Sequence, residues 1–351
     1  MSSWGLGIGL AERGWIPDRP LRGAIRRLCA ERLRGLEQLA AVNGQQGRSS
    51  IVTPGTMPLA VDTAQANEQH YELPSEYFQL VLGSRRKYSC CYWDEDTTNL
   101  DQAEEQSLQR VCAQAGIENG QRILDLGCGW GSLTVWLAEH YPASQIVAVS
   151  NSTRQRAAIM QKLSQRKLTN VEILTLDVGK SELRQLEQVA PFDRVVSIEM
   201  IEHMRNHELL LEQLCSLLAA DGALYFHFFC HDRHAYLFEE AGDSDWMTRY
   251  FFRGGMMPPR DLFQDISPRV KLVNSWIWPG THYQHTAEAW LERHDANRAA
   301  ILEIFAKHYG PAHAKRWFQR WRIFYLSVAE LFGYREGREW YVMHCLLRKT
   351  S

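Results

Sequence analysis

From residue 123 onward, short apolar runs alternate with longer amphipathic stretches. The apolar runs predict strands at residues 123–126, 145–150, 171–176, 192–198 and 222–229. The stretches between them predict helices at residues 131–140, 153–167, 181–189 and 207–219. Strands that alternate with helices are typical of a parallel sheet with right-handed crossovers. The pattern therefore predicts an α/β fold with a doubly wound sheet.

The alternation is interrupted after the fifth strand. Residues 231–265 form an insertion rich in aromatic residues, glycine and proline, and strand character resumes at 270–278 and 340–347. Two long helices, 286–309 and 311–332, separate those strands, and a further helix at about 100–115 precedes the sheet. Ligands bind at the carboxyl ends of the strands in such sheets, so we expect 231–265 and 284–334 to form a helical lid there.

The N-terminal part has a different pattern. Apolar residues recur at helical spacing from Leu21 to Leu39, and six arginines lie between residues 19 and 34, which predicts a basic amphipathic helix at 18–42. Such a helix could contact an anionic membrane, but packing on its own domain or on a partner subunit is the simpler interpretation. Residues 44–63 read as a linker. We therefore divide the chain into a leading segment, 1–65, and one domain, 66–351, whose core is about 100–230 and 266–351.

A glycine-rich turn follows the first strand of the sheet. It reads Asp125-x-Gly127-x-Gly129-x-Gly131 and leads into a predicted helix. Glycines there let a ligand approach the backbone, and the helix N-terminus favours an electron-rich ligand group. The spacing is neither that of the dinucleotide motif nor that of the phosphate-binding loop. We interpret it as a turn that binds S-adenosylmethionine.

Polar side chains also follow the next strands. Asp177 ends the third strand, where it could accept a hydrogen bond from an adenine amino group or cap a helix. The second strand lacks a terminal acid for ribose, so Asn151 or Gln155 could take that place. Aromatic residues of the lid, from Trp246 to Phe252, could form a cage for a cationic substrate.

Two carboxylates and an imidazole leave the fourth strand together. They are Glu199, Glu202 and His203. Crowding and burial at a strand end raise the pKa of a carboxylate and bring it closer to useful basicity. An amine must lose its proton before it can attack a methyl group, so this cluster could supply a base. The alternative is that the acids only stabilise a helix N-terminus, with His203 bonded in the core.

Composition narrows the class of protein. The 351 residues carry a formal net charge of −2, which argues against nucleic acid as a partner. The eight cysteines lack metal-type spacing, so we expect no metal site and a reducing compartment. No signal peptide or membrane-spanning run is evident, which predicts a cytoplasmic protein. The sequence allows a homodimer without requiring one.

Six motifs extend from about residue 66 to the end of the chain. They occupy Glu68–Pro74, Lys87–Tyr92, Asp125–Gly131, Ser197–Met204, Arg249–Pro258 and Val328–Tyr334. Together they resemble the motifs of a known family, the plant coclaurine N-methyltransferases of the cyclopropane fatty acid synthase superfamily. The resemblance implies a class I methyltransferase with a Rossmann-like seven-stranded sheet, its last strand antiparallel, and transfer from S-adenosylmethionine to a secondary or tertiary amine of a tetrahydroisoquinoline-like ring.

The resemblance also assigns roles to individual residues. Glu199 and His203 match a catalytic pair, Glu202 matches an acid that helps place the amine, and Phe332 matches a wall of the substrate pocket. We place the remaining matches, with Asp125 of the glycine-rich turn, around the cofactor. They are Tyr88, Ser89, Asp125, Gly127, Gly129, Asn151, Gln155, Asp177 and Val178.

The lipid branch of the superfamily supplies an alternative. Its members form cyclopropanes on unsaturated acyl chains of phospholipids, with bound bicarbonate as the base, and a membrane contact would then be expected. The matching bicarbonate ligands are Cys90, Glu202, His227 and Tyr325. We favour the amine because Glu199 and the run around it resemble the N-methyltransferases more closely. Tyr325 stands where that branch leads us to expect phenylalanine, which leaves the accepted ring open.

Overall fold

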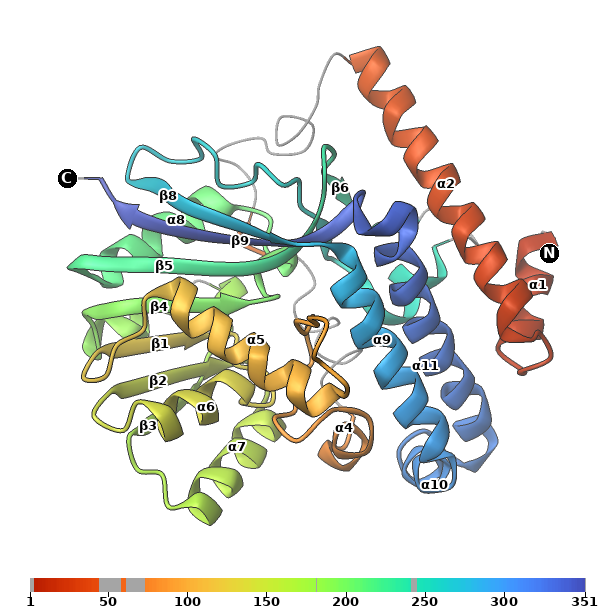
Figure 1. Cartoon of the computed structure of the whole chain (residues 1–351), viewed down its shortest axis with the longest axis horizontal. Helices are drawn as coiled ribbons and strands as arrows, with labels where there is room; N and C mark the ends of the chain where they lie inside the picture. Colours follow the sequence, from red (N-terminus) through yellow and green to blue (C-terminus); the bar gives the residue numbers. More distant parts are fainter. Residues whose placement is uncertain (1–2, 44–57, 61–72, 181, 241–244, 351) are drawn as a thin grey trace.

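The computed structural model describes residues 3–43, 58–60, 73–180, 182–240 and 245–350. Its centre is a seven-stranded sheet in the order β3-β2-β1-β4-β5-β9-β8 (Figure 1). Strands β1 to β5 are parallel, whereas the last strand, β9, runs antiparallel between β5 and β8. The predicted class I methyltransferase sheet is therefore confirmed. The strands are β1 Arg122–Leu126, β2 Gln145–Ser150, β3 Val171–Thr175, β4 Phe192–Ile198, β5 Leu218–His231, β8 Val270–Trp278 and β9 Trp340–Lys349.

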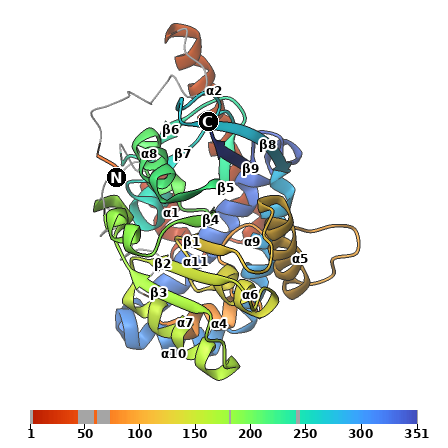
Figure 2. The same cartoon turned by 90° about the vertical axis from the view of Figure 1, so that its left-hand side faces the viewer.

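Helices cover both faces of this sheet. On one side lie α5 Leu100–Ala115, α6 Ser132–His140 and α7 Thr153–Arg166. On the other side lie α8 His207–Leu217 and the short 3₁₀ turns η2 Val178–Lys180 and η3 Glu182–Gln188 (Figure 2). Neighbouring strand residues alternate between the two cores, as Ile123 and Leu124 do, because side chains along a strand point to opposite faces.

Local sequence fixes the ends of several helices. Asn99 begins α5 by accepting a hydrogen bond from the Gln102 amide, and Gly116 ends it in a left-handed conformation. Ser152 caps α7 and Asn206 caps α8 through the same kind of side-chain acceptor. These caps place the loops after β2 and β4 at the carboxyl edge of the sheet.

Two predicted helices differ in the structure. The helix expected at 181–189 is only the short 3₁₀ turn η3 Glu182–Gln188. The helix expected at 286–309 begins earlier and is two helices, α9 Gly280–Ala296 and α10 Arg298–Tyr309. Asn297 separates them, with its side chain donating to the carbonyls of Arg293 and Leu80.

The lid stands at one end of the sheet. It consists of α9, α10 and α11 Pro311–Phe332, joined by α4 Ser75–Val81 (Figure 1). The insertion after β5 adds β6 Tyr236–Leu237, the π-helical turn η5 Thr248–Phe252 and β7 Met256–Met257. The lid shares one hydrophobic core with α5 and α6, so it is packed on the sheet rather than hinged away from it.

The N-terminal helices pack on this lid. The predicted basic helix is α2 Asp18–Asn43, and an unpredicted helix, α1 Ser3–Ala11, precedes it. Arg22 pairs with Glu288 and Glu330, and Arg26 pairs with Glu330, both carboxylates belonging to the lid. Packing on its own chain, the simpler interpretation of α2, is confirmed. The proposed boundary at 65/66 and the first residues of the Glu68–Pro74 motif lie outside the described residues.

In the described part of the chain, no helix is both long and apolar enough to cross a membrane.

Candidate active site

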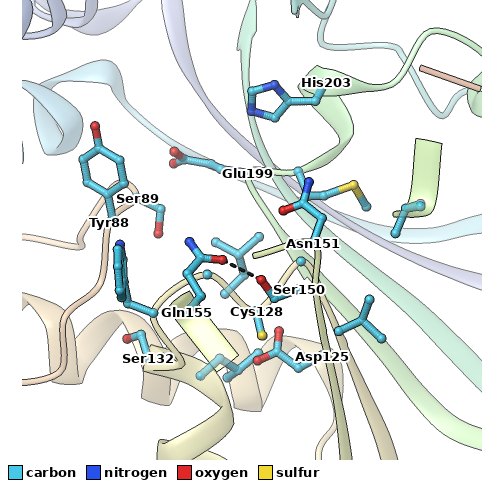
Figure 3. Close-up of a pocket in the computed structure, with 18 of the residues that line it drawn as sticks. Tyr88, Ser89, Asp125, Cys128, Ser132, Ser150, Asn151, Gln155, Glu199 and His203 are labelled. Atoms are coloured by element: carbon cyan, nitrogen blue, oxygen red, sulfur yellow. Dashed lines mark hydrogen bonds between the residues drawn. The ribbon is translucent and has the colours of Figure 1, made fainter. Parts of the chain in front are cut away.

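A cavity opens at the carboxyl ends of β1, β2 and β4. Its empty volume, including the open mouth, is about 1080 Å³. All nine residues predicted to surround the cofactor line it, and so do Glu199 and His203 (Figure 3). The nine predicted residues come from four separate segments, 88–89, 125–129, 151–155 and 177–178. The parallel strands bring them together because each of the last three segments begins at or just after a strand end.

The glycine-rich turn needs glycine for two different reasons. Gly127 and Gly129 have φ values of +84° and +53°, a region that other residues avoid. A Cβ at Gly127 would also lie 2.8 Å from Met200 Cγ, whereas a Cβ at Gly129 would meet nothing within 4 Å. Because Gly129 lines the cavity, its open side is space that a ligand can occupy.

Asp125 holds the base of this turn. Its carboxylate is buried and accepts a hydrogen bond of 2.6 Å from Thr134 Oγ1 on α6. Burial raises the pKa of Asp125 to about 6. The bond ties the end of β1 to the helix that follows the turn.

Two buried hydrogen-bond donors without a partner among the residues that the structure describes line the part of the cavity where the sequence predicts the ribose. Gln155 Oε1 accepts a 2.6 Å hydrogen bond from Ser150 Oγ, which fixes the side chain. Gln155 Nε2 and Ser132 Oγ are buried and have no hydrogen-bond partner among the described residues. Buried donors of this kind are normally satisfied, so both atoms fit a polar ligand in the cavity. S-Adenosylmethionine, which carries hydroxyl and carboxylate groups, satisfies that requirement.

Asp177 and Val178 form another part of the cavity wall. Asp177 Oδ1 accepts from the Gly179 amide at 3.0 Å, which is the capping role considered from the sequence. Asp177 Oδ2 lies 3.4 Å from Lys180 Nζ. Val178 is buried against the cavity. The carboxylate and the apolar side chain together suit the edge and face of an adenine ring.

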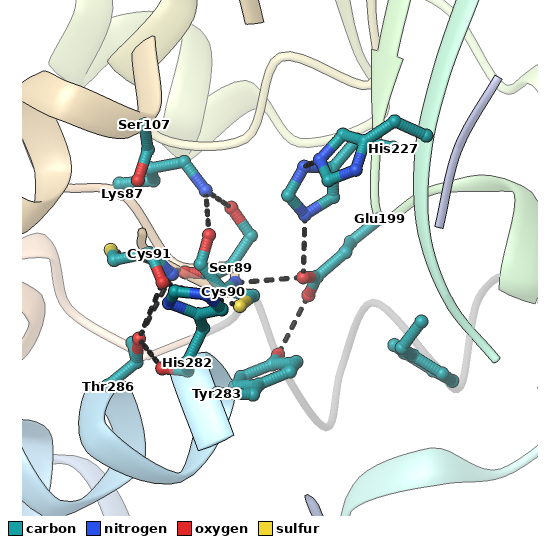
Figure 4. A network of polar contacts seen from close by, with 12 residues as sticks. Lys87, Ser89, Cys90, Cys91, Ser107, Glu199, His227, His282, Tyr283 and Thr286 are labelled. Atoms are coloured by element: carbon teal, nitrogen blue, oxygen red, sulfur yellow. Dashed lines mark hydrogen bonds and ion pairs between the residues drawn. The ribbon is translucent and has the colours of Figure 1, made fainter. Parts of the chain in front are cut away.

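Glu199 is the focus of the polar contacts in the site (Figure 4). Its Oε1 accepts from the Cys90 amide at 2.8 Å and lies 3.2 Å from His227 Nε2. Its Oε2 accepts from the Tyr283 hydroxyl at 2.7 Å. The three contacts come from the 88–90 segment, β5 and α9, so the carboxylate joins the lid to the sheet.

A buried lysine stands close to this carboxylate. Lys87 is 1% exposed and donates to Ser89 Oγ at 2.6 Å and to the Cys90 carbonyl. Burial raises the pKa of Glu199, and the positive charge of Lys87 opposes that rise. Lys87 therefore favours the ionised form of Glu199.

The pKa values of the other two members of the strand-end cluster are also shifted. Burial and the nearby charge of Glu199 raise the pKa of Glu202 well above its usual range. Burial lowers the pKa of His203 to about 4. The ring of His203 is therefore neutral near pH 7, and the environment of Glu202 favours its protonated form.

Several residues predicted to bind substrate do not line the cavity. Glu202 Oε1 accepts from the Phe229 amide at 2.9 Å, and its buried Oε2 has no hydrogen-bond partner among the described residues. Phe332 stacks on Tyr283, with ring centroids 4.4 Å apart, and so supports a residue that contacts Glu199. Tyr325 lies in the lid core and bonds to Tyr77 Oη at 2.7 Å.

The residues suggested as bicarbonate ligands have other contacts in this structure. The Cys90 amide and His227 contact the Glu199 carboxylate, and Tyr325 bonds to Tyr77. The arrangement of Cys90, Glu202, His227 and Tyr325 around one anion stays a prediction of the lipid alternative.

The predicted aromatic cage is likewise not formed. Phe251 stacks on Phe324 inside the core, with ring centroids 4.5 Å apart. Arg320 lies over Tyr250, with its Cζ 3.9 Å from the ring centroid. Phe252 is the ring that reaches the site, lying parallel to His203 at 5.8 Å. The aromatic residues mostly pack the lid.

Sequence reasoning missed three residues around Glu199. Lys87 belongs to a quoted motif but received no role, and Tyr283 sits in a helix without a distinctive pattern. His344, on β9, contacts His227 at 3.0 Å. Nothing in the linear spacing connects Tyr283 or His344 to residue 199, since only the fold brings them near.

The fold and the cavity define a class I S-adenosylmethionine-dependent methyltransferase. Within that class, residues 60–332 match the model of the mycolic acid cyclopropane synthetase family. The chain belongs to this family, which confirms the resemblance seen in its motifs.

Similar proteins include members of both branches. The chain is 35% identical to (S)-coclaurine N-methyltransferase of Thalictrum flavum subsp. glaucum, over 96% of this chain and 94% of that protein. A crystal structure of coclaurine N-methyltransferase bound to N-methylheliamine and S-adenosylhomocysteine matches with a TM-score of 0.88 at 36% identity, covering 97% of this chain and 98% of the other. Cyclopropane-fatty-acyl-phospholipid synthase of Escherichia coli is 28% identical, over 79% of this chain and 66% of that protein.

Proposed function

We propose that this chain transfers the methyl group of S-adenosylmethionine to a secondary or tertiary amine of a small aromatic, tetrahydroisoquinoline-like ring. The observation that carries the proposal is the buried Glu199 carboxylate, held by donors from three segments at the wall of the cavity. The similarity to coclaurine N-methyltransferase over nearly the whole chain supports the same substrate class.

The cofactor would be held by the residues that line the cavity. The backbone at Gly127 and Gly129 would lie under its methionine part, next to Tyr88 and Ser89. Gln155 and Asn151 would face the ribose, and Asp177 with Val178 the adenine. When bound, the cofactor supplies a methyl group on a positively charged sulfur, which is already reactive toward a neutral amine.

The residues of the site would then prepare the acceptor. An amine is mostly protonated near pH 7 and must lose that proton before its lone pair can attack. Glu199 in its ionised form and His203 in its neutral form are both able to take it. When His203 takes the proton, Glu199 keeps its negative charge, which stabilises the positive charge that the product nitrogen carries after transfer. Positioning of the amine in the cavity supplies much of the remaining acceleration.

The lipid alternative has less support from this site. Its base is bicarbonate, and the donors assigned to that anion contact Glu199 instead. The arginines Arg22 and Arg26 of α2, candidates for a membrane contact, pair with Glu288 and Glu330 of the lid. The cytoplasmic location and a homodimer stay predictions.

The test is a turnover assay followed by mass spectrometry. S-Adenosylmethionine is offered with tetrahydroisoquinoline amines in one reaction and with unsaturated phospholipid vesicles in another. We expect one added methyl group on an amine and unmodified acyl chains. We also expect Glu199→Gln and His203→Ala to lower turnover at least tenfold, a transition-state loss of about 1.4 kcal/mol or more, with little change in cofactor binding. Methylene added to the acyl chains, with the amines untouched, would refute the proposal.

A further inference from the structure

Two buried histidines stand behind the Glu199 carboxylate on neighbouring strands. His227 on β5 and His344 on β9 are direct partners in the antiparallel register. His227 Nε2 lies 3.2 Å from Glu199 Oε1, and His227 Nδ1 lies 3.0 Å from His344 Nε2. Glu199 lines the cavity and the two histidines do not, so the three residues form a hydrogen-bonded chain that begins at the cavity wall and continues into the sheet (Figure 4 shows its first two members).

The direction of these hydrogen bonds follows from the other contacts of Glu199. Its Oε1 accepts from the Cys90 amide and its Oε2 accepts from the Tyr283 hydroxyl. Both oxygens thus act as acceptors, so His227 Nε2 carries the proton and donates to Oε1. In a neutral imidazole the other nitrogen then holds a lone pair, and His344 Nε2 must donate to His227 Nδ1. Burial lowers the pKa of both rings well below the usual range of histidine, which keeps them neutral.

Close packing holds the two rings in this arrangement. Both are fully buried. Trp278 lies 4.2 Å from the ring of His344 and 5.3 Å from that of His227, measured between centroids. Rotation of either ring would need this tryptophan to move. The orientation of His227 is therefore set by His344 on one side and by Trp278 on another.

We infer that His344 is a positioning residue, which acts through His227 to keep Glu199 ionised and directed at the cavity. This inference rests on the proposed role of Glu199 as proton acceptor. A hydrogen bond donated to a carboxylate stabilises the anion, and that bond is available only while His227 carries its proton on Nε2. Without the donor from His344, His227 is free to hold its proton on Nδ1 and to present a lone pair to Glu199.

Other charged and titratable groups also act on this chain. Lys87 favours the ionised Glu199, and the remaining groups act in both directions. The groups that face the chain are Lys87, Cys90, Glu202, His203, His282 and Tyr283. A substitution at His344 leaves all of them in place, so a change in the titration of Glu199 reports on the histidine chain itself.

The experiment is an infrared pH titration of the protonated-carboxyl band of the full-length protein. The difference from Glu199→Gln identifies the contribution of Glu199. In His344→Leu the midpoint of that contribution should move to higher pH by about one unit, since the anion loses a charge-assisted hydrogen bond. His344→Gln should restore it, because a glutamine amide can donate to His227 Nδ1. If His344→Leu does not fold, His344→Phe takes its place.

A matched control separates this effect from general damage to the core. His294 is also fully buried, but it contacts Tyr77 in the lid. His294→Leu should lower the melting temperature and leave the Glu199 midpoint unchanged. A midpoint that stays in place in folded His344→Leu, or moves equally in His344→Gln, would overturn the inference. The titration needs no methyl acceptor, so failure of the N-methyltransferase proposal in the turnover assay remains a separate result.

Discussion

Glu199 combines an unusual backbone conformation with its contacts to three segments of the chain. Its φ of +46° is in the left-handed region, which costs a residue with a Cβ roughly 1–2 kcal/mol. The Glu199 amide donates to the His227 carbonyl at 2.7 Å, and the side-chain contacts to Cys90, His227 and Tyr283 add to this. A strained conformation held so firmly is typical of a functional residue. The strain turns the chain out of β4 and directs the carboxylate toward the lid.

Two glycines of the turn provide a prediction at the same scale. Gly127→Ala and Gly129→Ala both place a Cβ at positive φ, which costs roughly 1–2 kcal/mol of stability. Gly127→Ala should cost more, since its Cβ also collides with Met200. Gly129→Ala has no such collision, but its methyl group enters the cavity and should weaken S-adenosylhomocysteine binding about tenfold or more.

Thermal unfolding and isothermal titration calorimetry measure the two effects. Each variant serves as the control for the other. Both carry the strain of a Cβ at positive φ, but the new Cβ points at Met200 in one variant and into the cavity in the other. Equal losses of stability and affinity in both variants would contradict the orientation described for the turn.

At the scale of elements, helix α5 holds the segment that carries Tyr88 and Ser89. Glu104 is fully buried on this helix and accepts from the amides of Gly83, Arg85 and Lys87 at 2.9, 2.7 and 3.1 Å. Glu104→Gln replaces one acceptor oxygen by an amide group, leaving a backbone donor unsatisfied at a cost of about 1–3 kcal/mol. We expect lower stability and weaker cofactor binding, read by denaturant unfolding and calorimetry.

The adjacent residue supplies the control. Glu105 pairs with Arg85 near the surface, and pairs of that kind contribute about 0–1 kcal/mol. Glu105→Gln should therefore leave cofactor affinity close to that of the wild type. If Glu104→Gln bound the cofactor equally well, the segment 83–87 would not depend on α5.

The order of elements was largely predictable from sequence, and their ends were not. Buried parallel strands such as β1 and β2 are short apolar runs, so their positions follow from hydrophobicity. The break at Asn297 accompanies a side-chain hydrogen bond to the Leu80 carbonyl. Such a contact joins residues far apart in the sequence, and hydrophobic periodicity does not record it. The 3₁₀ geometry at 182–188 is likewise not distinguished from an α-helix by periodicity.

The candidate site was likewise predictable from the sequence only in part. The lining of the cavity was predictable, because Asp125, Asn151 and Asp177 each lie at or just after the end of a strand and the ends of parallel strands meet. The support around Glu199 was not, because Tyr283 and His344 reach it only through the packing of α9 and β9. The resemblance placed Glu202 and Tyr325 near the substrate, and in the structure they bond to Phe229 and Tyr77.

At the scale of the whole molecule, the first helices and the lid form one unit. Asp18 on α2 accepts two hydrogen bonds from Arg322 on α11, while Glu12, just after α1, is bonded by Arg320 of the same helix. Glu330, 6% exposed, binds two arginines of α2. Removing one partner of such a buried pair leaves an uncompensated charge. The N-terminal helices thus stabilise the lid that carries Tyr283, far from them in sequence.

Buried histidines make the stability of this whole unit depend on pH. Burial lowers the pKa of several of them, so at these groups the folded chain binds fewer protons than the unfolded chain below about pH 6.5. Each such group makes stability rise with pH between about 4 and 6.5 and fall on acidification through that range, by up to about 1.4 kcal/mol per pH unit. Buried carboxyl groups with a raised pKa act in the opposite direction, as Asp125 does with a pKa of about 6 and Glu104 with a pKa of about 7. The pKa is lowered to about 4 or about 3, or well below the usual range, at His203, His207, His231, His282, His294, His227 and His344.

Urea unfolding at pH 7, 6 and 5 measures this dependence. We expect a steep decrease of the free energy of unfolding across the series, and a slope lower by about one proton in His294→Gln, which removes one of the buried groups. His313→Gln, at an exposed position, should keep the wild-type slope. A slope that is the same in His294→Gln and in the wild type would mean that this buried ring takes up its proton without cost, which would contradict the prediction. The comparison isolates the histidine, because the buried carboxyl groups are the same in both proteins.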